Sequence, residues 1–298
     1  MVDDRHTAGP VVVGVVEAQG QEQVVLRAAE EAARAGTVLR VVHAAERASP
    51  AGSTEAGADG EAHADRAERV IAPLAEAVHR RFPDLAVEPD VVSGSPASAL
   101  VDRSAEASLI VVGHRGTGGF PRLPLGSVSL QVATHSRCPV LVVRPRRRTE
   151  PGVERVVVGV DVDDMQPHVM EFALRAAAAR GAPLEVVHGS TRPDLLGTGP
   201  TGPLLVGHEK RPSVAKDLLE ERLGPYRSRC DDLDIRTRVE RSRPAHLLVD
   251  SSRDATLLVV GSHGRTGLRR LMLGSVSGEV LHTARCPVVV VPPPEAEE

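Results

Sequence analysis

A 39-residue segment that occurs twice is the strongest constraint on how this chain folds. Residues 107–145 and 255–293 align without gaps at 22 identical positions. Each copy has a short apolar run rich in β-branched residues, then spaced glycines, then a Gly-Ser pair. Such a run is typical of a buried parallel strand, and the residues after Gly-Ser have helical character. The chain therefore has to form the same strand, loop and helix twice.

The duplication extends over whole domains. The sequence VVVGV at 11–15 recurs at 156–160, and a VVH tripeptide recurs at the same offset. A length of 298 residues also fits about two domains of ordinary size. We predict tandem domains at 1–146 and 152–298, joined by the charged, proline-flanked linker at 144–152.

Strands and helices are predicted to alternate within each copy. The expected strands are 11–16, 37–43, 86–92, 108–113 and 139–143, then 154–160, 183–188, 235–240, 256–261 and 287–291. This alternation predicts an α/β fold made of two tandem, doubly wound, five-stranded parallel-sheet domains. Ligands of such sheets bind beyond the carboxyl ends of the strands. Both glycine loops follow the fourth strand at that end.

Composition excludes several kinds of partner. With 36 basic and 40 acidic residues the net charge is −4, which favours neither nucleic acid nor acidic lipid. One Tyr, three Phe and no Trp leave few platforms for stacking bases. No apolar run approaches the roughly 18 residues of a membrane helix, and the polar N-terminus is unlike a signal peptide. Three cysteines without a C-x-x-C motif complete the prediction of a reduced cytoplasmic protein.

The glycine loops carry the predicted chemistry, with the spacing G-x2-G-x9-G-S in both copies. The motif residues are Gly113, Gly116, Gly126 and Ser127, and Gly261, Gly264, Gly274 and Ser275. Glycine allows close backbone approach, and a helix N-terminus offers free N–H groups to an anion. We expect Ser275 and the N–H groups of Val276 and Ser277 to bind phosphate, with Val128 and Ser129 as their counterparts. The alternative is a plain tight turn, which the repetition of the spacing makes less attractive.

This pattern resembles the nucleotide-binding loop of the universal stress protein family, and the likeness covers nearly all of the chain. The resemblance implies a Rossmann-like, adenine-nucleotide alpha-hydrolase-like fold that binds ATP, with Mg²⁺ as its companion ion, or another adenine nucleotide. It also implies an Asp at the end of the first strand that contacts the adenosine. The second copy has Asp161 there, whereas the first has Val16. Gly189 and Ala44 match the adenine-facing position. The alternative role for Asp161 is a helix N-cap.

Charged residues around the loops are weaker candidates. Arg265, directly after the second loop glycine, is the arginine best placed to screen phosphate charge. The alternative for this residue is a solvated surface position, as it is for Arg115, Arg122, Arg269 and Arg270. The histidines at 43, 188 and 263 are expected to be structural, since no carboxylate partner is identifiable.

Family resemblance further implies that two such domains pair through their last strands. Segments 139–143 and 287–291 would then meet antiparallel, making the chain an intramolecular pseudo-dimer. Pairing also removes two apolar edge strands, which would otherwise invite aggregation. A homodimer of the intact chain is left open.

The function that follows is an adenine-nucleotide-binding module for stress response or signalling. One alternative is an enzyme with weak ATP hydrolysis or phosphotransfer, although no general base or metal-binding set is evident beyond Asp161, Asp163 and Asp164. Another alternative is a nucleotide-free interaction module, which Val16 keeps open.

Overall fold

The computed structural model describes residues 9–45, 58–115, 125–144, 154–190, 212–262 and 272–294. These residues form two compact units. The first contains the described residues up to 144, the pair 272–273, and the C-terminal segment from Pro287. The second contains 154–262 and Gly274–Cys286. The predicted linker lies almost entirely outside the described residues, so the domain limits 1–146 and 152–298 stay a prediction.

Five parallel strands form the centre of the first unit. They are β1 (Val11–Val15), β2 (Leu39–Ala45), β3 (Val87–Ser93), β4 (Leu109–Gly113) and β5 (Val140–Val143). Their order in the sheet is β3-β2-β1-β4-β5. Strand β1 lies in the middle of the sheet. The next two strands, β2 and β3, are added on one side of it, and β4 and β5 are added on the other side. The sheet is therefore doubly wound, as predicted.

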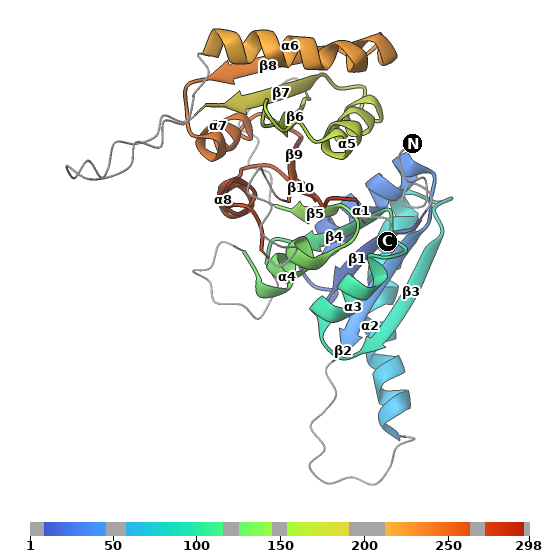
Figure 1. Cartoon of the computed structure of the whole chain (residues 1–298). Coiled ribbons are helices and arrows are strands. Elements are labelled where there is room, and N and C mark those ends of the chain that lie inside the picture. Colours follow the sequence, from blue (N-terminus) through green and yellow to red (C-terminus); the bar gives the residue numbers. More distant parts are fainter. Residues whose placement is uncertain are drawn as a thin grey trace, which may run out of the picture. The chain divides into compact units, whose positions relative to one another are not determined.

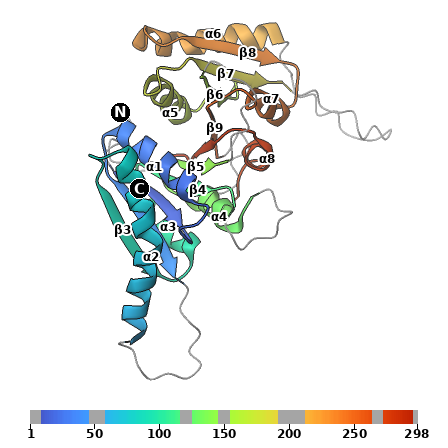
Figure 2. The same ribbon diagram turned by 180° about the vertical axis from the view of Figure 1, so that it is seen from behind.

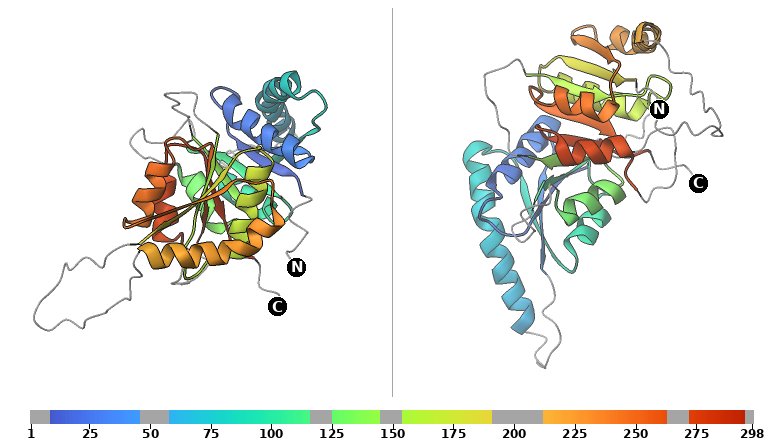
Figure 3. Two further views of the ribbon diagram at one scale, coloured as in Figure 1. Left: turned by 90° about the horizontal axis from the view of Figure 1, so that it is seen from above. Right: turned by 90° about the vertical axis from the view of Figure 1, so that its left-hand side faces the viewer.

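Four helices cover the two faces of that sheet. They are α1 (Glu22–Ala35), α2 (Ala58–Arg81), α3 (Pro96–Arg103) and α4 (Ser127–His135). Helices α1 and α2 contact each other on one face, and α3 and α4 contact each other on the opposite face (Figure 3). The apolar side of α1, formed by Val25, Ala28, Ala29 and Ala32, is buried. The core is therefore built from Val, Leu and Ala.

The second unit repeats this architecture. Its parallel strands are β6 (Val156–Gly159), β7 (Leu184–Gly189), β8 (Ile235–Glu240) and β9 (Leu257–Gly261), in the order β9-β6-β7-β8. Its helices are α5 (Pro167–Ala178), α6 (Pro212–Arg229), α7 (Pro244–Ser251) and α8 (Ser275–Thr283). Helix α6 runs along β8 (Figure 1), and α7 contacts α8 (Figure 2). The predicted tandem α/β fold is confirmed.

The last strand of the chain, β10 (Val288–Val291), pairs antiparallel with β5 of the first unit. Val288 lies opposite Val142, and Val290 lies opposite Val140. Every residue of both strands is buried. Segments 139–143 and 287–291 thus meet in the predicted antiparallel sense, and β5 is covered by a neighbour. The wider pseudo-dimer model stays a prediction.

The two copies share small details of packing. A Cβ atom on Gly14 would lie 2.6 Å from Leu100 Cδ1, and one on Gly159 would lie 2.7 Å from Leu248 Cδ1. The glycine of each VVVGV segment therefore lets α3 or α7 approach the central strand closely. Cys138 and Cys286, which precede the last strands, are both buried. Burial raises the pKa of the Cys138 thiol to about 12, as for a packing residue rather than a reactive one.

A fully buried serine connects the same elements in each copy. Ser104 and Ser252 lie at the ends of α3 and α7, and each donates a hydrogen bond to the carbonyl three residues earlier. Each also accepts one, at 2.9 Å, from the backbone N–H of Arg137 or Arg285 in the turn before the last strand. These bonds fix the turn that contains Arg137 to the end of α3, and the turn that contains Arg285 to the end of α7. Within the described residues, no helix is both long and apolar enough to cross a membrane.

Candidate functional site

The described site residues of the second unit gather at one edge of its sheet. Asp161 follows β6, Gly189 ends β7 and Gly261 ends β9. Since β6 pairs in parallel with both β7 and β9, the three positions lie side by side at the carboxyl edge. The loop after β9 then leads to Gly274 and α8. The structure therefore brings together residues that are more than 100 positions apart in the sequence.

The N-terminus of α8 leaves backbone N–H groups without a partner among the described residues. Gly274 is its N-cap residue, and no side-chain hydrogen bond caps it among the described residues. The Gly274 N–H donates to the Ser262 carbonyl at 2.8 Å, and the first intrahelical bond runs from Gly278 N–H back to the Gly274 carbonyl. The N–H groups of Ser275, Val276 and Ser277 precede that bond, so they are the orphan donors of the first turn. The Ser275 side chain is exposed beside them.

The serine two residues into each helix has a structural task. The Ser277 hydroxyl is buried and lies 3.0 Å from the carbonyl oxygens of both Ser262 and Gly274. In the first unit the Ser129 hydroxyl donates to the Gly113 carbonyl at 2.5 Å. These bonds hold the helix start against the strand end. Only the backbone N–H groups of Ser129 and Ser277 are therefore left for a ligand, which is the role predicted for them.

Asp161 does not cap a helix. Helix α5 has Gln166 as its N-cap residue, and Asp161 lies five positions before it. Asp161 Oδ1 instead accepts a hydrogen bond from the Asp163 N–H at 3.0 Å, and its carbonyl accepts one from the Asp164 N–H at 3.1 Å. The carboxylate thus orders the turn directly after β6. The N-cap alternative is excluded, and the contact with adenosine stays a prediction.

Gly189 has a clear structural reason to lack a side chain. A Cβ atom there would lie 2.8 Å from Pro244 Cα and 2.9 Å from the Ser242 carbonyl oxygen. Because both are backbone atoms, the β8–α7 turn would have to move to make room. The end of β7 is therefore packed tightly against the start of α7, and the adenine-facing role of Gly189 stays a prediction.

The first unit has the same backbone arrangement with different side chains. Gly126 is the N-cap of α4 and donates from its N–H to the His114 carbonyl at 2.8 Å, while the Ser127 side chain is exposed. Val16 replaces the carboxylate at the end of β1, with 49% of its surface exposed. Its N–H donates to Gln21 Oε1 at 2.9 Å. The backbone at the helix start is thus the same in both units, and the carboxylate after the first strand is missing from the first unit.

The side chains of the two units also differ at other positions of the carboxyl edge. We use the term edge row for three residues at the carboxyl ends of the first three strands of the second unit, and for the residues of the first unit that align with them in the repeat. The edge row is Val16, Ala44 and Val92 in the first unit and Asp161, Gly189 and Glu240 in the second. Ala44 lies opposite Val92, and Gly189 lies opposite Glu240, in the strand registers. One row is apolar and the other carries two carboxylates.

Two buried histidines connect strand ends, as expected for structural residues. His43 Nδ1 lies 3.2 Å from the Val15 carbonyl oxygen. His188 Nδ1 lies 3.1 Å from the Val160 carbonyl oxygen and 3.3 Å from the Val162 nitrogen. Both rings thereby bind the second strand of a unit to the end of its first strand. No carboxylate hydrogen bond to either ring occurs in the described residues.

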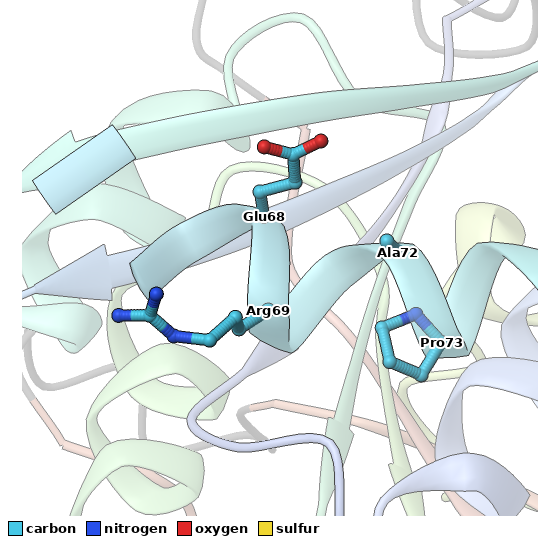
Figure 4. Close-up of a pocket in the computed structure, with 4 residues that line it drawn as sticks. All are labelled: Glu68, Arg69, Ala72 and Pro73. Carbon is cyan, nitrogen blue, oxygen red and sulfur yellow. The ribbon is translucent and has the colours of Figure 1, made fainter. Parts of the chain in front are cut away.

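Several predicted residues cannot be placed. Gly116, Gly264, Arg265, Arg122, Arg269, Arg270 and His263 lie outside the described residues. No cluster of metal-binding side chains occurs in the part of the chain that the structure describes. A pocket lies on α2 of the first unit, lined by Glu68, Arg69, Ala72 and Pro73 (Figure 4). It contains none of the predicted site residues.

Arg243 is a candidate that sequence reasoning missed. It is the N-cap residue of α7, and its guanidinium Nη2 lies 3.1 Å from Glu279 Oε2 on α8. The sequence shows only that an Arg precedes Pro244, at the carboxyl end of a predicted strand. Its proximity to α8 depends on how α7 packs against α8, which no local pattern encodes.

Comparisons with known proteins agree with this architecture. The model of the universal stress protein family matches residues 8–144 and 152–292. A universal stress protein of Mycolicibacterium smegmatis is 34% identical over 230 residues, which make up 77% of this chain and 75% of that protein. The crystal structure of a universal stress protein from Archaeoglobus fulgidus has the same fold, with a TM-score of 0.70 at 18% identity over 99% of this chain and 100% of that one. A universal stress protein in complex with cAMP matches 46% of this chain and 98% of its own, at 28% identity and a TM-score of 0.36.

Proposed function

The chain belongs to the universal stress protein family, and from this premise we propose that it binds an adenine nucleotide at the carboxyl edge of its second unit. The expected ligand is ATP. Nucleotide occupancy would make the protein a module for stress response or signalling, whose partner choice or stability changes with the bound ligand.

One observation carries the proposal. The start of α8, which no side chain caps among the described residues, lies at the same sheet edge as Asp161 and Gly189. The free N–H groups of Ser275, Val276 and Ser277, together with the Ser275 hydroxyl, would bind phosphate oxygens. The positive end of the helix dipole favours the same negative charge. Asp161 would accept a hydrogen bond from the nucleoside, and Gly189 would leave room for the base.

In this proposal Mg²⁺ would bind together with ATP, and the protein would not hold the ion on its own. Mg²⁺ in nucleotide sites is held largely by phosphate oxygens and water, with one or two carboxylates. Asp161, Asp163 and Asp164 are the described carboxylates that follow β6 and could supply such a ligand. No proton-transfer step is assigned to them. Measuring phosphate release during incubation with ATP tests the alternative of weak hydrolysis.

The proposal is tested by titrating ATP into the intact chain and into the Gly274→Val variant in a calorimeter. The valine side chain would fill the volume next to the orphan N–H groups, so binding to the second site should be lost. Gly278→Val is the matched control, because a Cβ atom on this glycine of α8 meets no atom within 4 Å. Circular dichroism checks that both variants are folded. Unchanged ATP affinity in a folded Gly274→Val variant would mean that the loop is only a turn.

A further inference from the structure

The ion pair between Arg243 and Glu279 joins two helix starts at the edge of the second unit. Arg243 precedes α7, Glu279 is the fifth residue of α8, and the two helices pack against each other (Figure 2). The Nη2–Oε2 distance is 3.1 Å, although the side chains remain 68% and 40% exposed. An exposed pair of this kind contributes little to stability. The pair is therefore of interest for where it holds the Arg243 side chain, and not for its contribution to stability.

Helix geometry places the Arg243 guanidinium near the proposed phosphate cradle, which is the Ser275 hydroxyl and the N–H groups of residues 275–277. Glu279 lies four residues after Ser275, so both side chains are on the same face of α8. The rise of four residues is about 6 Å along the helix axis. Side chains in a helix also lean toward its N-terminus. A guanidinium that contacts the Glu279 carboxylate is thus about one helical turn from the Ser275 hydroxyl.

The first unit has neither member of this pair. Ser95 and Gln131 occupy the corresponding positions, 148 residues earlier in the chain. Neither carries a charge. The Arg243–Glu279 pair is therefore a feature of the second unit alone, the same unit that has Asp161.

We infer that Arg243 is a phosphate-contacting residue of the second site and that Glu279 holds it beside the cradle until a ligand arrives. Guanidinium binds phosphate through parallel, charge-assisted hydrogen bonds. A polyphosphate at the start of α8 competes with Glu279 for Arg243, and Glu279 also repels that negative charge. This inference rests on the proposed function, and it adds a residue that selects for the phosphate chain rather than for the nucleoside.

The test is calorimetric titration of ATP and of adenosine into the intact chain and three variants. Arg243→Gln should weaken ATP binding about tenfold, the value of one charged hydrogen bond. Glu279→Gln should strengthen ATP binding, because it frees Arg243 and removes a repelling charge. Adenosine affinity should change in neither variant. Arg253→Gln is the control, since Arg253 follows the opposite end of α7 and pairs with Asp250 at 3.1 Å.

The outcomes separate this inference from the proposed function. If the unaltered chain binds no ATP, both are overturned. ATP binding that Arg243→Gln leaves unchanged overturns the inference alone. Equal weakening of ATP binding by Arg243→Gln and Glu279→Gln, accompanied by lower melting temperatures, would instead identify the pair as a clamp between α7 and α8. ATP binding that is weaker in the first variant and tighter in the second supports the inference.

Discussion

The carboxyl edges of the sheets in the two units have the same backbone arrangement but different side chains. Each has a strand that ends in glycine and a helix with Gly-Ser at its start that no side chain caps among the described residues. Each also has a buried serine hydroxyl that donates to a carbonyl at the strand end. The edge rows differ: the first is apolar, and the second has carboxylates at 161 and 240. The two copies thus share a backbone arrangement and differ in the side chains at the carboxyl edge.

The largest expected effect of this difference is on nucleotide affinity. A carboxylate that accepts a hydrogen bond from a sugar or base contributes about 1.5–3 kcal/mol. Asp161→Val should therefore weaken ATP binding by roughly ten- to a hundredfold, and Val16→Asp should strengthen the first site. Calorimetry with limiting ATP measures both, with Asp231→Val, an exposed carboxylate in the α6–β8 turn, as the control. Two equal sites in the unaltered chain, or no effect of Asp161→Val, would contradict the asymmetry.

A smaller effect is expected on stability at the ends of β2 and β7. Gly189→Ala places a Cβ atom 2.8 Å from Pro244 Cα, and overpacking of this kind costs about 1–3 kcal/mol of unfolding free energy. The reverse change in the first unit, Ala44→Gly, creates no clash and should cost less than about 1 kcal/mol through backbone entropy. Urea denaturation of the intact chain measures both. Equal losses would show that the two strand ends tolerate side chains alike.

The smallest effect is expected on the pH dependence of stability, through an ion pair that the second unit lacks. Arg103 binds Asp90 with two hydrogen bonds of 2.6 and 3.0 Å, whereas Arg238 and Ser251 occupy the corresponding positions of the second unit. The hydrogen bonds from Arg103 hold the pKa of Asp90 below its ordinary value of 3.8.

Because the folded-state pKa of Asp90 is depressed, its stabilising contribution is present above about pH 4 and is lost as the pH falls through the folded pKa. Asp90→Asn should therefore lower the free energy of unfolding at pH 7 and change it little below that pKa. Urea denaturation at a series of pH values measures this. A loss of equal size at every pH would mean that the carboxylate charge is unimportant.

Much of the fold could be predicted because its signals are local and repeated. Short β-branched runs, helical segments and glycines recur at one spacing in both copies. A strand or helix predicted in one copy can therefore be checked against the other copy. The doubly wound sheet was predicted from strand–helix alternation, and the antiparallel meeting of β5 and β10 was predicted from the family resemblance. The glycines and serines of the loops were identified for the same reason, although Gly116, Gly264 and Arg265 lie outside the described residues.

What the sequence determined by itself is the duplicated α/β scaffold and the position of its glycine loops, since periodicity and spacing are properties of neighbouring residues. Only the tertiary structure decided how individual groups are used. It excluded Asp161 as a helix cap, assigned the Ser277 hydroxyl to the Ser262 carbonyl, and packed Gly189 against the start of α7. It also placed Arg243 beside Glu279. These contacts join residues that are distant in the chain, so their partners are determined by how strands and helices pack and not by any local pattern.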